Sequence, residues 1–212
     1  MTGKNVALAC LTLTGAATLV LLAIAHRPRT VHAAVQTPAV SFVPVYSKDG
    51  DMTPPANYRE WIYLTSGLDM SYTPKPSEDM SMFDNVFVNP EAYRSFKETG
   101  TWPDKTIMVL EVRGAKNKGS INKSGHFQNG EVMGIELHVK DETRFPGKWA
   151  FFDVASDRKA TLIPQGAPCY TCHADHAAVD TTFVQFYPTL LPIAKQKKTL
   201  SASFLKETES EK

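Results

Sequence analysis

Residues 106–113 read TIMVLEVR, residues 131–140 read EVMGIELHVK, and the chain between them, 114–130, reads GAKNKGSINKSGHFQNG. The first segment is apolar on both of its alternating faces, which is typical of a buried central strand. The second alternates between an apolar and a polar face, as a half-exposed strand does. The connection is rich in glycine, asparagine and lysine, which predicts a long exposed hairpin. Two strands joined without a helix pair in an antiparallel manner, so this stretch sets the class of sheet.

On either side of this hairpin the sequence supplies further strands and a helix. Residues 83–88 and 148–155 read as strands. Between them a helix is expected to begin at Pro90, with Asn89 as its cap, since proline suits the first helical position and asparagine can accept from the open amides. Gly100 can end that helix in a left-handed conformation.

Two more helices are expected near the ends of the domain. From Asn57 onward, apolar residues recur at helical spacing as far as Gly67. A terminal helix is expected over 181–195 with Asp180 as its cap, although two prolines should kink or shorten it. The sequence therefore predicts an α+β fold, an antiparallel β-sheet with flanking helices.

Cys169-Tyr170-Thr171-Cys172-His173 has the C-x-x-C-H spacing by which haem c is attached to a chain. Two thioethers fix the porphyrin, and the adjacent imidazole becomes an iron ligand. A zinc site would need a second pair of ligands, and the remaining cysteine, Cys10, lies in an apolar N-terminal run. We therefore expect one covalently bound haem c near the C-terminus, held by Cys169, Cys172 and His173, and a disulfide is the second interpretation.

The N-terminal residues 1–33 resemble an export signal. Lys4 precedes the uncharged run 6–25, and Val31-His32-Ala33 resembles a cleavage site. Because the run is as long as a membrane-spanning helix, an uncleaved anchor in the inner membrane is the alternative. Either interpretation predicts a periplasmic protein, the compartment in which bacteria attach haem c.

The rest of the chain divides by composition. Residues 34–55 are proline-rich and read as a flexible linker, 56–197 as the haem domain, and 198–212 as a polar C-terminal tail. The net charge is +1, with both signs mixed along the chain, so no nucleic-acid partner is expected. The function must therefore be sought at the haem.

Several blocks of this sequence resemble the cytochrome P-460 family in order and spacing, over about residues 56–195. These blocks are YREW (58–61), FVNP (87–90), GTWPD (100–104), HVKD (138–141), WAFF (149–152), CYTCH (169–173) and VDTTFVQFYP (179–188). The resemblance implies a periplasmic haem c domain on an antiparallel sheet, a homodimer, His173 as the proximal ligand and an open distal face.

The resemblance implies one of two functions. Cytochrome P-460 enzymes oxidise hydroxylamine and carry a covalent bond from a lysine to the porphyrin, whereas their cytochrome c′-beta relatives lack that bond and bind nitric oxide at a five-coordinate iron. Where the enzymes read like Val-Lys-Glu, this chain reads Val109-Leu110-Glu111. The nearest lysine, Lys105, is kept as a cross-link candidate, although a solvated turn cation is the favoured interpretation.

Candidate sixth ligands of the iron can be weighed by type. Met108 and Met133 lie in expected strands and are interpreted as core residues. His126 and His138 are expected to face solvent, and His176 lies too close to His173 to reach the opposite side of the haem. The iron is therefore expected to be five-coordinate.

Glu136 is the preferred distal acid or base, since it lies on the polar face of its strand and a haem pocket would raise its pKa. A surface glutamate in an alternating strand is the alternative interpretation. Glu111 and Arg113 compete for that role. Arg59 and Arg144 are candidates to pair with haem propionates, although surface ion pairs are an equal alternative.

These observations predict a periplasmic mono-haem c cytochrome that binds or converts a small nitrogen oxide, nitric oxide or hydroxylamine. Whether it is an enzyme stays open. The alternatives are an electron-transfer cytochrome, which needs a periplasmic partner, and a nitric oxide sensor or buffer of the cytochrome c′-beta type.

Overall fold

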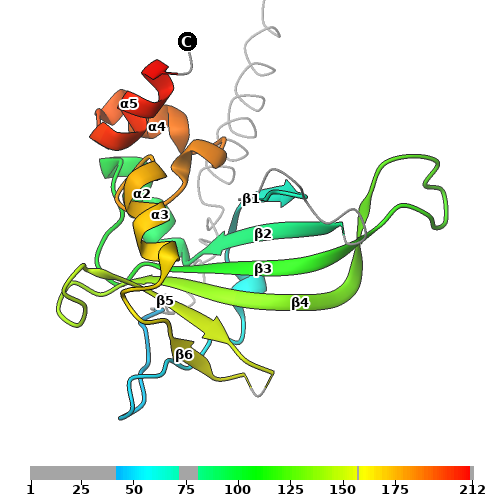
Figure 1. Cartoon of the computed structure of the whole chain (residues 1–212), viewed down its shortest axis with the longest axis horizontal. Coiled ribbons are helices and arrows are strands. Elements are labelled where there is room, and N and C mark those ends of the chain that lie inside the picture. The colour runs from blue at the N-terminus through cyan, green and yellow to red at the C-terminus, as the bar shows by residue number, and fades with distance from the viewer. Residues whose placement is uncertain (1–41, 72–80, 157, 211–212) are drawn as a thin grey trace, which may run out of the picture. The chain divides into compact units, whose positions relative to one another are not determined.

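The computed structural model describes residues 42–71, 81–156 and 158–210 of this chain, and the expected signal segment lies outside them (Figure 1). Six strands form one antiparallel sheet in which each strand pairs with its neighbours in sequence. The strands are β1 (Ile62–Leu68), β2 (Met82–Val88), β3 (Ile107–Lys116), β4 (Phe127–Lys140), β5 (Trp149–Val154) and β6 (Ala160–Leu162). The helices are α2 (Pro90–Thr99), α3 (Pro168–His176), α4 (Leu191–Lys197) and α5 (Ala202–Ser210), with 3-10 turns η1 (Tyr58–Glu60) and η2 (Val184–Phe186). The predicted α+β class is confirmed.

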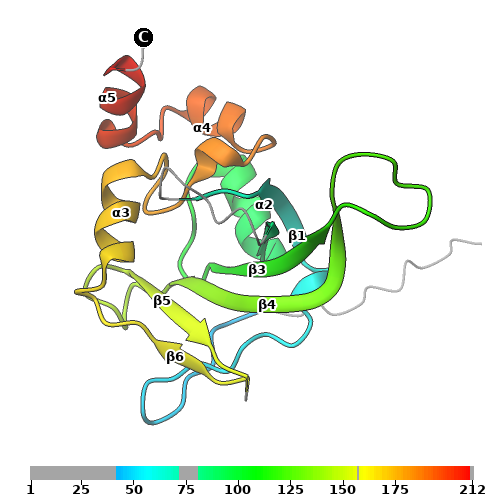
Figure 2. The ribbon, with the colours of Figure 1, turned by 45° about the vertical axis from the view of Figure 1, so that its right-hand side comes forward.

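The sheet separates two apolar cores, one on each face. On the face we call the helix face, Val88, Met108 and Trp149 pack with α2 and the C-terminal segment. On the opposite face, which we call the arm face, alternate residues of β3, β4 and β5 pack with the N-terminal arm, residues 42–61. Figure 2 shows α2 and α3 on one side of the sheet and the arm, in blue to cyan, on the other.

Helix α2 forms as its sequence predicts, with one difference at its start. It begins at Pro90 and ends at Gly100, whose φ of 78° is left-handed. Its buried side chains, Ala92 and Phe96, pack into the helix-face core. Asn89 does not cap the helix with its side chain; instead its Oδ1 accepts a hydrogen bond from the amide of Ile107, 2.8 Å away. The side chain thus ties the helix to β3.

The prediction of a helix after Asn57 is wrong. Only Tyr58–Glu60 are helical, and Ile62–Leu68 form β1 at the edge of the sheet. The pairing with β2 slips between Tyr63 and Thr65, which places the apolar residues at uneven intervals. That spacing imitates a helical period, whereas the aromatic and β-branched residues of the segment suit a strand.

The prediction of a terminal helix over 181–195 is also wrong. The chain makes a tight turn at Asp180, whose φ is 53°, then the short turn η2, and becomes helical only at Leu191. Pro188 and Pro192 break the segment as prolines do, and Pro192 lies in the first turn of α4.

Three other segments differ from expectation. Residues 160–162, expected as loop, add strand β6, and the expected polar tail contains α5. In the expected linker, Met52 pairs with both Tyr46 and Ala160, so its described part is attached to the sheet. Within the described residues, no helix has the length and apolar character needed to cross a bilayer.

Candidate haem site

Helix α3 brings the residues of the C-x-x-C-H motif onto one side. Pro168 begins the helix, and Cys169 and Cys172 follow as free, half-buried thiols. Residues three and four apart share a helix face, so both thiols and the imidazole of His173 point to the same side of α3. This arrangement suits two thioethers and an axial ligand to one porphyrin, and a haem fits the donor set.

The imidazole of His173 is held in a defined orientation. Its Nδ1 lies 2.7 Å from the carbonyl oxygen of Thr181, so the N–H at that position donates to the backbone. The ring packs against Phe183 at 4.2 Å and Phe151 at 4.6 Å between centroids. Burial lowers the pKa of His173, although the carbonyl of Thr181 opposes this shift. A neutral imidazole whose Nδ1 is occupied presents Nε2 as a metal ligand.

His138 is buried beside His173, and the expectation that it faces solvent is wrong. Its side chain is only 8% exposed, because Phe151 stacks on it at 4.1 Å and 13° and Trp149 packs at 4.4 Å. Its Nε2 lies 3.2 Å from the hydroxyl oxygen of Thr181. His138 therefore supports the same side of the site as His173, which does not suit a sixth ligand on the opposite side.

Glu136 lies on the helix face of β4, two residues before His138. Its cross-strand neighbours are Leu110 on β3 and Asp153 on β5. The pKa of Glu136 is raised, first because neighbouring side chains displace water and then because of the charges of Asp153 and Asp84. The carboxylate remains accessible, as a distal acid or base must be.

The helix face is open around Glu136. At Gly134, which pairs with Val112, an added Cβ would meet no atom within 4 Å. Val86, Leu110 and Val112 are only partly buried on this face. An apolar, half-covered surface on the same face of the sheet as His138 suits a flat apolar group such as a porphyrin.

Glu111 and Arg113, the rivals of Glu136, are bound to each other on the arm face. Glu111 is buried and accepts hydrogen bonds from Tyr58 Oη, Arg59 Nε at 2.8 Å, and Arg113. Burial would raise the pKa of Glu111, but these donors outweigh it and lower that pKa. Burial and the hydrogen bond to Glu111 raise the pKa of Tyr58 to about 12. The sheet separates this network from Glu136, so neither rival reaches the helix face.

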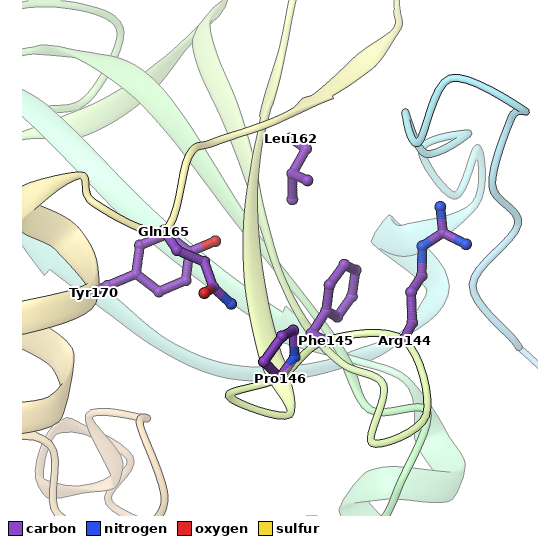
Figure 3. A pocket seen from close by; sticks show the side chains of 6 residues that line it. All are labelled: Arg144, Phe145, Pro146, Leu162, Gln165 and Tyr170. Carbon is purple, nitrogen blue, oxygen red and sulfur yellow. The ribbon is translucent and has the colours of Figure 1, made fainter.

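The two arginines expected at haem propionates are engaged elsewhere. Arg59 forms an ion pair with Glu111. Arg144 stacks on the ring of Tyr46, 4.1 Å from its centroid. It also lines a pocket of about 460 Å³ beside Tyr170, together with Phe145, Pro146, Leu162 and Gln165 (Figure 3). Arg59 thus belongs to the arm face, whereas Arg144 contacts Tyr46 of the arm and also lines the pocket beside Tyr170 of α3.

Lys105 is ion-paired rather than freely solvated. Its Nζ lies 2.5 Å from Asp141 Oδ1 and 3.6 Å from Asp104 Oδ2. Burial lowers the pKa of Lys105, but the hydrogen bonds and charges of Asp141 and Asp104 together outweigh this effect and raise it. Leu110, by contrast, lies on the helix face opposite Glu136. The residue that the family resemblance aligns with the cross-link is therefore on the same face of the sheet as Glu136 and His138, and it carries no nucleophile.

The other candidate sixth ligands occupy four different settings. Met108 is buried in the helix-face core, as expected, whereas Met133 is 41% exposed and not a core residue. His126 is exposed on the β3–β4 connection, and Nδ1 of His176 lies 3.1 Å from Glu207.

Comparison with protein families identifies the family of this chain. The family model for Cytochrome P460 matches residues 55–184, more than half of the chain. The chain belongs to the Cytochrome P460 family. Membership of this family makes it a haem cytochrome, and the matched range contains Leu110, Glu136 and the whole CYTCH motif. The chain matches no curated protein.

Two supporting residues of the site were not found from the sequence. Thr181 supplies the carbonyl that orients His173, and Tyr170 donates from its phenol to the carbonyl of Ile163 while accepting from the amide of Phe151. Neither role follows from periodicity, because both contacts join segments that only the fold brings together. The position of Tyr170 within the C-x-x-C-H motif was the available signal.

Proposed function

We propose that this protein is an exported haem c cytochrome that binds nitric oxide at a five-coordinate iron. One haem is attached through Cys169 and Cys172, and His173 is its axial ligand. The observation that carries the proposal is the hydrogen bond from His173 Nδ1 to the carbonyl of Thr181, which leaves Nε2 available on the side of α3 that carries both thiols.

The chain's own residues define what happens around a bound ligand. A bound haem supplies an iron atom with an open axial position. Leu110 and Val112 keep the adjoining sheet face apolar, which excludes water. Glu136 is the titratable group on that face closest in register to Leu110, and burial and the charges of Asp153 and Asp84 raise its pKa. It is therefore our candidate for the acid or base beside a bound ligand.

Binding is favoured over hydroxylamine oxidation by the residues at the expected cross-link. Leu110 has no nucleophile to join the porphyrin, and Nζ of Lys105 is paired with Asp141. Peptide mapping of the holoprotein tests this point. We expect haem on the peptide containing Cys169 and Cys172 alone, whereas haem also joined to a lysine peptide would restore hydroxylamine oxidation as the function.

Mass spectrometry of the mature protein tests haem attachment. One haem should remain bound after denaturation and acid–acetone extraction, and Cys169→Ala with Cys172→Ala should release it. Thr171→Ala, which leaves the C-x-x-C-H spacing intact, is the matched control and should keep the haem. A polypeptide mass with a disulfide between residues 169 and 172 and no haem would contradict the proposal.

The ferrous protein provides the test of ligand binding. We expect a high-spin optical spectrum and rapid binding of nitric oxide and carbon monoxide. His173→Ala should lose this spectrum because it removes the axial ligand. A low-spin ferrous protein that does not bind carbon monoxide would show instead that a second side chain coordinates the iron.

Electron transfer is the alternative function, and it would require a second side chain on the iron. Met108 is buried in the helix-face core, and Met133 is 41% exposed but continues the alternation of Ile135 and Leu137, which pack on the arm face. Neither methionine therefore supports the alternative, and a low-spin ferrous spectrum would be the result that restores it.

Export and dimerisation are part of the same proposal, and they are supported by the N-terminal sequence and the family resemblance. A periplasmic electron-transfer partner belongs to the alternative function. Cell fractionation should find the protein in the periplasm. N-terminal sequencing distinguishes a signal cleaved near Ala33 from an uncleaved anchor. Sedimentation of the holoprotein should give a homodimer.

A further inference from the structure

The turn between α3 and η2, residues 177–183, is connected to its surroundings at several points. Thr182 accepts a hydrogen bond from Trp102 Nε1 at 2.7 Å and donates to the carbonyl of Val179 at 2.8 Å. Lys140 reaches Asp180 at 3.3 Å. We call residues 177–183 the Thr181 turn. Contacts of Asp180 and Thr182 hold its backbone on both sides of Thr181.

Thr181 contacts two histidines at once. Its carbonyl oxygen accepts from His173 Nδ1 at 2.7 Å, and its hydroxyl oxygen lies 3.2 Å from His138 Nε2. The two rings themselves meet edge to face, with centroids 5.1 Å apart. One residue therefore links the proximal ligand to a buried histidine of the sheet.

His138 is a rigid anchor for this link. It lies in the paired part of β4, between Met108 on β3 and Phe151 on β5. Phe151 and Trp149 enclose its ring. An imidazole buried between aromatic rings is costly unless its polar atoms are bonded, so the contact with Thr181 is favoured over an unbonded alternative.

We propose that His138 is a positioning residue for His173, acting through the hydroxyl of Thr181 to fix the carbonyl that receives the Nδ1 proton. This inference rests on the proposed role of His173 as the axial ligand. A stronger bond from Nδ1 makes an axial imidazole more basic, which strengthens its bond to iron and stabilises the ferric state. His138 thereby adjusts the reduction potential without touching the haem.

The test compares Thr181→Val and His138→Phe with the wild-type holoprotein. Valine at position 181 keeps the backbone carbonyl and removes the side-chain hydroxyl. Phenylalanine at position 138 keeps a ring between Phe151 and Trp149 and removes the ring nitrogen Nε2 that contacts Thr181. The readouts are the reduction potential and the iron–histidine stretching band in the resonance Raman spectrum of the ferrous protein. Haem content by mass and circular dichroism establish that each variant is loaded and folded.

Both variants should lower the stretching frequency and raise the reduction potential. The double variant should match the larger single effect, because both changes remove the same contact. Matched controls are Thr161→Val on β6 and His126→Phe on the β3–β4 connection, both exposed in the structure and expected to change neither readout.

Unchanged potential and frequency in loaded, folded variants would overturn the inference. So would an effect of His138→Phe that Thr181→Val does not share, since the ring packing would then be responsible. The absence of an iron–histidine band in the wild type would instead contradict the proposed function, and the inference with it.

Discussion

At the scale of single residues, two carboxylates on opposite faces of the sheet have pKa values shifted in opposite directions. Glu111 on the arm face is surrounded by donors that lower its pKa, whereas burial and the acidic neighbours Asp153 and Asp84 raise the pKa of Glu136 on the helix face. The first is a structural anion, and the second is suited to exchange a proton.

Glu136→Gln should gain stability relative to the wild type as pH rises. A folded-state pKa above the unfolded value favours folding only while the group is protonated, so wild-type stability falls from about pH 4.3 upward through the raised pKa. Glutamine does not titrate, and haem over the carboxylate would shift the pKa in the same direction. Denaturant unfolding at pH 4 and pH 7 measures the difference, with Glu131→Gln on the same strand as control. An equal difference at both pH values would contradict the shift.

Tyr58→Phe should lower the free energy of unfolding by about 1.5–3 kcal/mol, the usual contribution of a hydrogen bond to a charged group. Tyr58 is buried and donates to Glu111, whose pKa is lowered in the folded state. Because stability from a lowered carboxyl pKa is lost as pH falls, the deficit should shrink below about pH 4. Tyr63→Phe, at a tyrosine that is 53% exposed, should have almost no effect. Similar decreases in the free energy of unfolding of Tyr58→Phe and Tyr63→Phe would show that the hydrogen bond from Tyr58 to Glu111 does not stabilise the fold.

At the scale of elements, the sequence predicts what local pattern dictates. β2, β3, β4, β5 and α2 follow from alternation and from capping residues, and the C-x-x-C-H motif locates three site residues. β1 and the 181–195 segment were misassigned, because an irregular strand register and two prolines outweigh apolar spacing. His138 could not be placed from its strand pattern, since its burial depends on α3 and on the Thr181 turn.

Gly100→Ala should cost at least about 1–2 kcal/mol, the penalty for an L-residue in the left-handed conformation. Gly100 has a φ of 78°, and an added Cβ would come within 2.6 Å of Lys197 Cβ on α4. The end of α2 would therefore move away from α4. Gly147→Ala is the matched control, since a Cβ there meets no atom within 4 Å. Thermal unfolding of both variants measures the effect, and equal melting temperatures would contradict this account of the α2–α4 contact.

At the scale of the whole molecule, one sheet supports both cores, so we expect the described domain to unfold as a unit. Trp61 lies in the arm-face core, and Trp102 and Trp149 lie in the helix-face core. Tryptophan fluorescence and far-ultraviolet circular dichroism should give one common midpoint in denaturant. Two separated unfolding transitions would show that the arm-face core and the helix-face core unfold independently.

The late position of the C-x-x-C-H motif has a consequence for how the protein is made. A chain leaves the ribosome from its N-terminus, and all six strands, residues 62–162, precede Cys169. Because each strand pairs with its predecessor, the sheet can assemble after export without waiting for the segment that carries the thiols. We therefore expect haem attachment to follow sheet formation, with the two cysteines presented on a nearly complete scaffold.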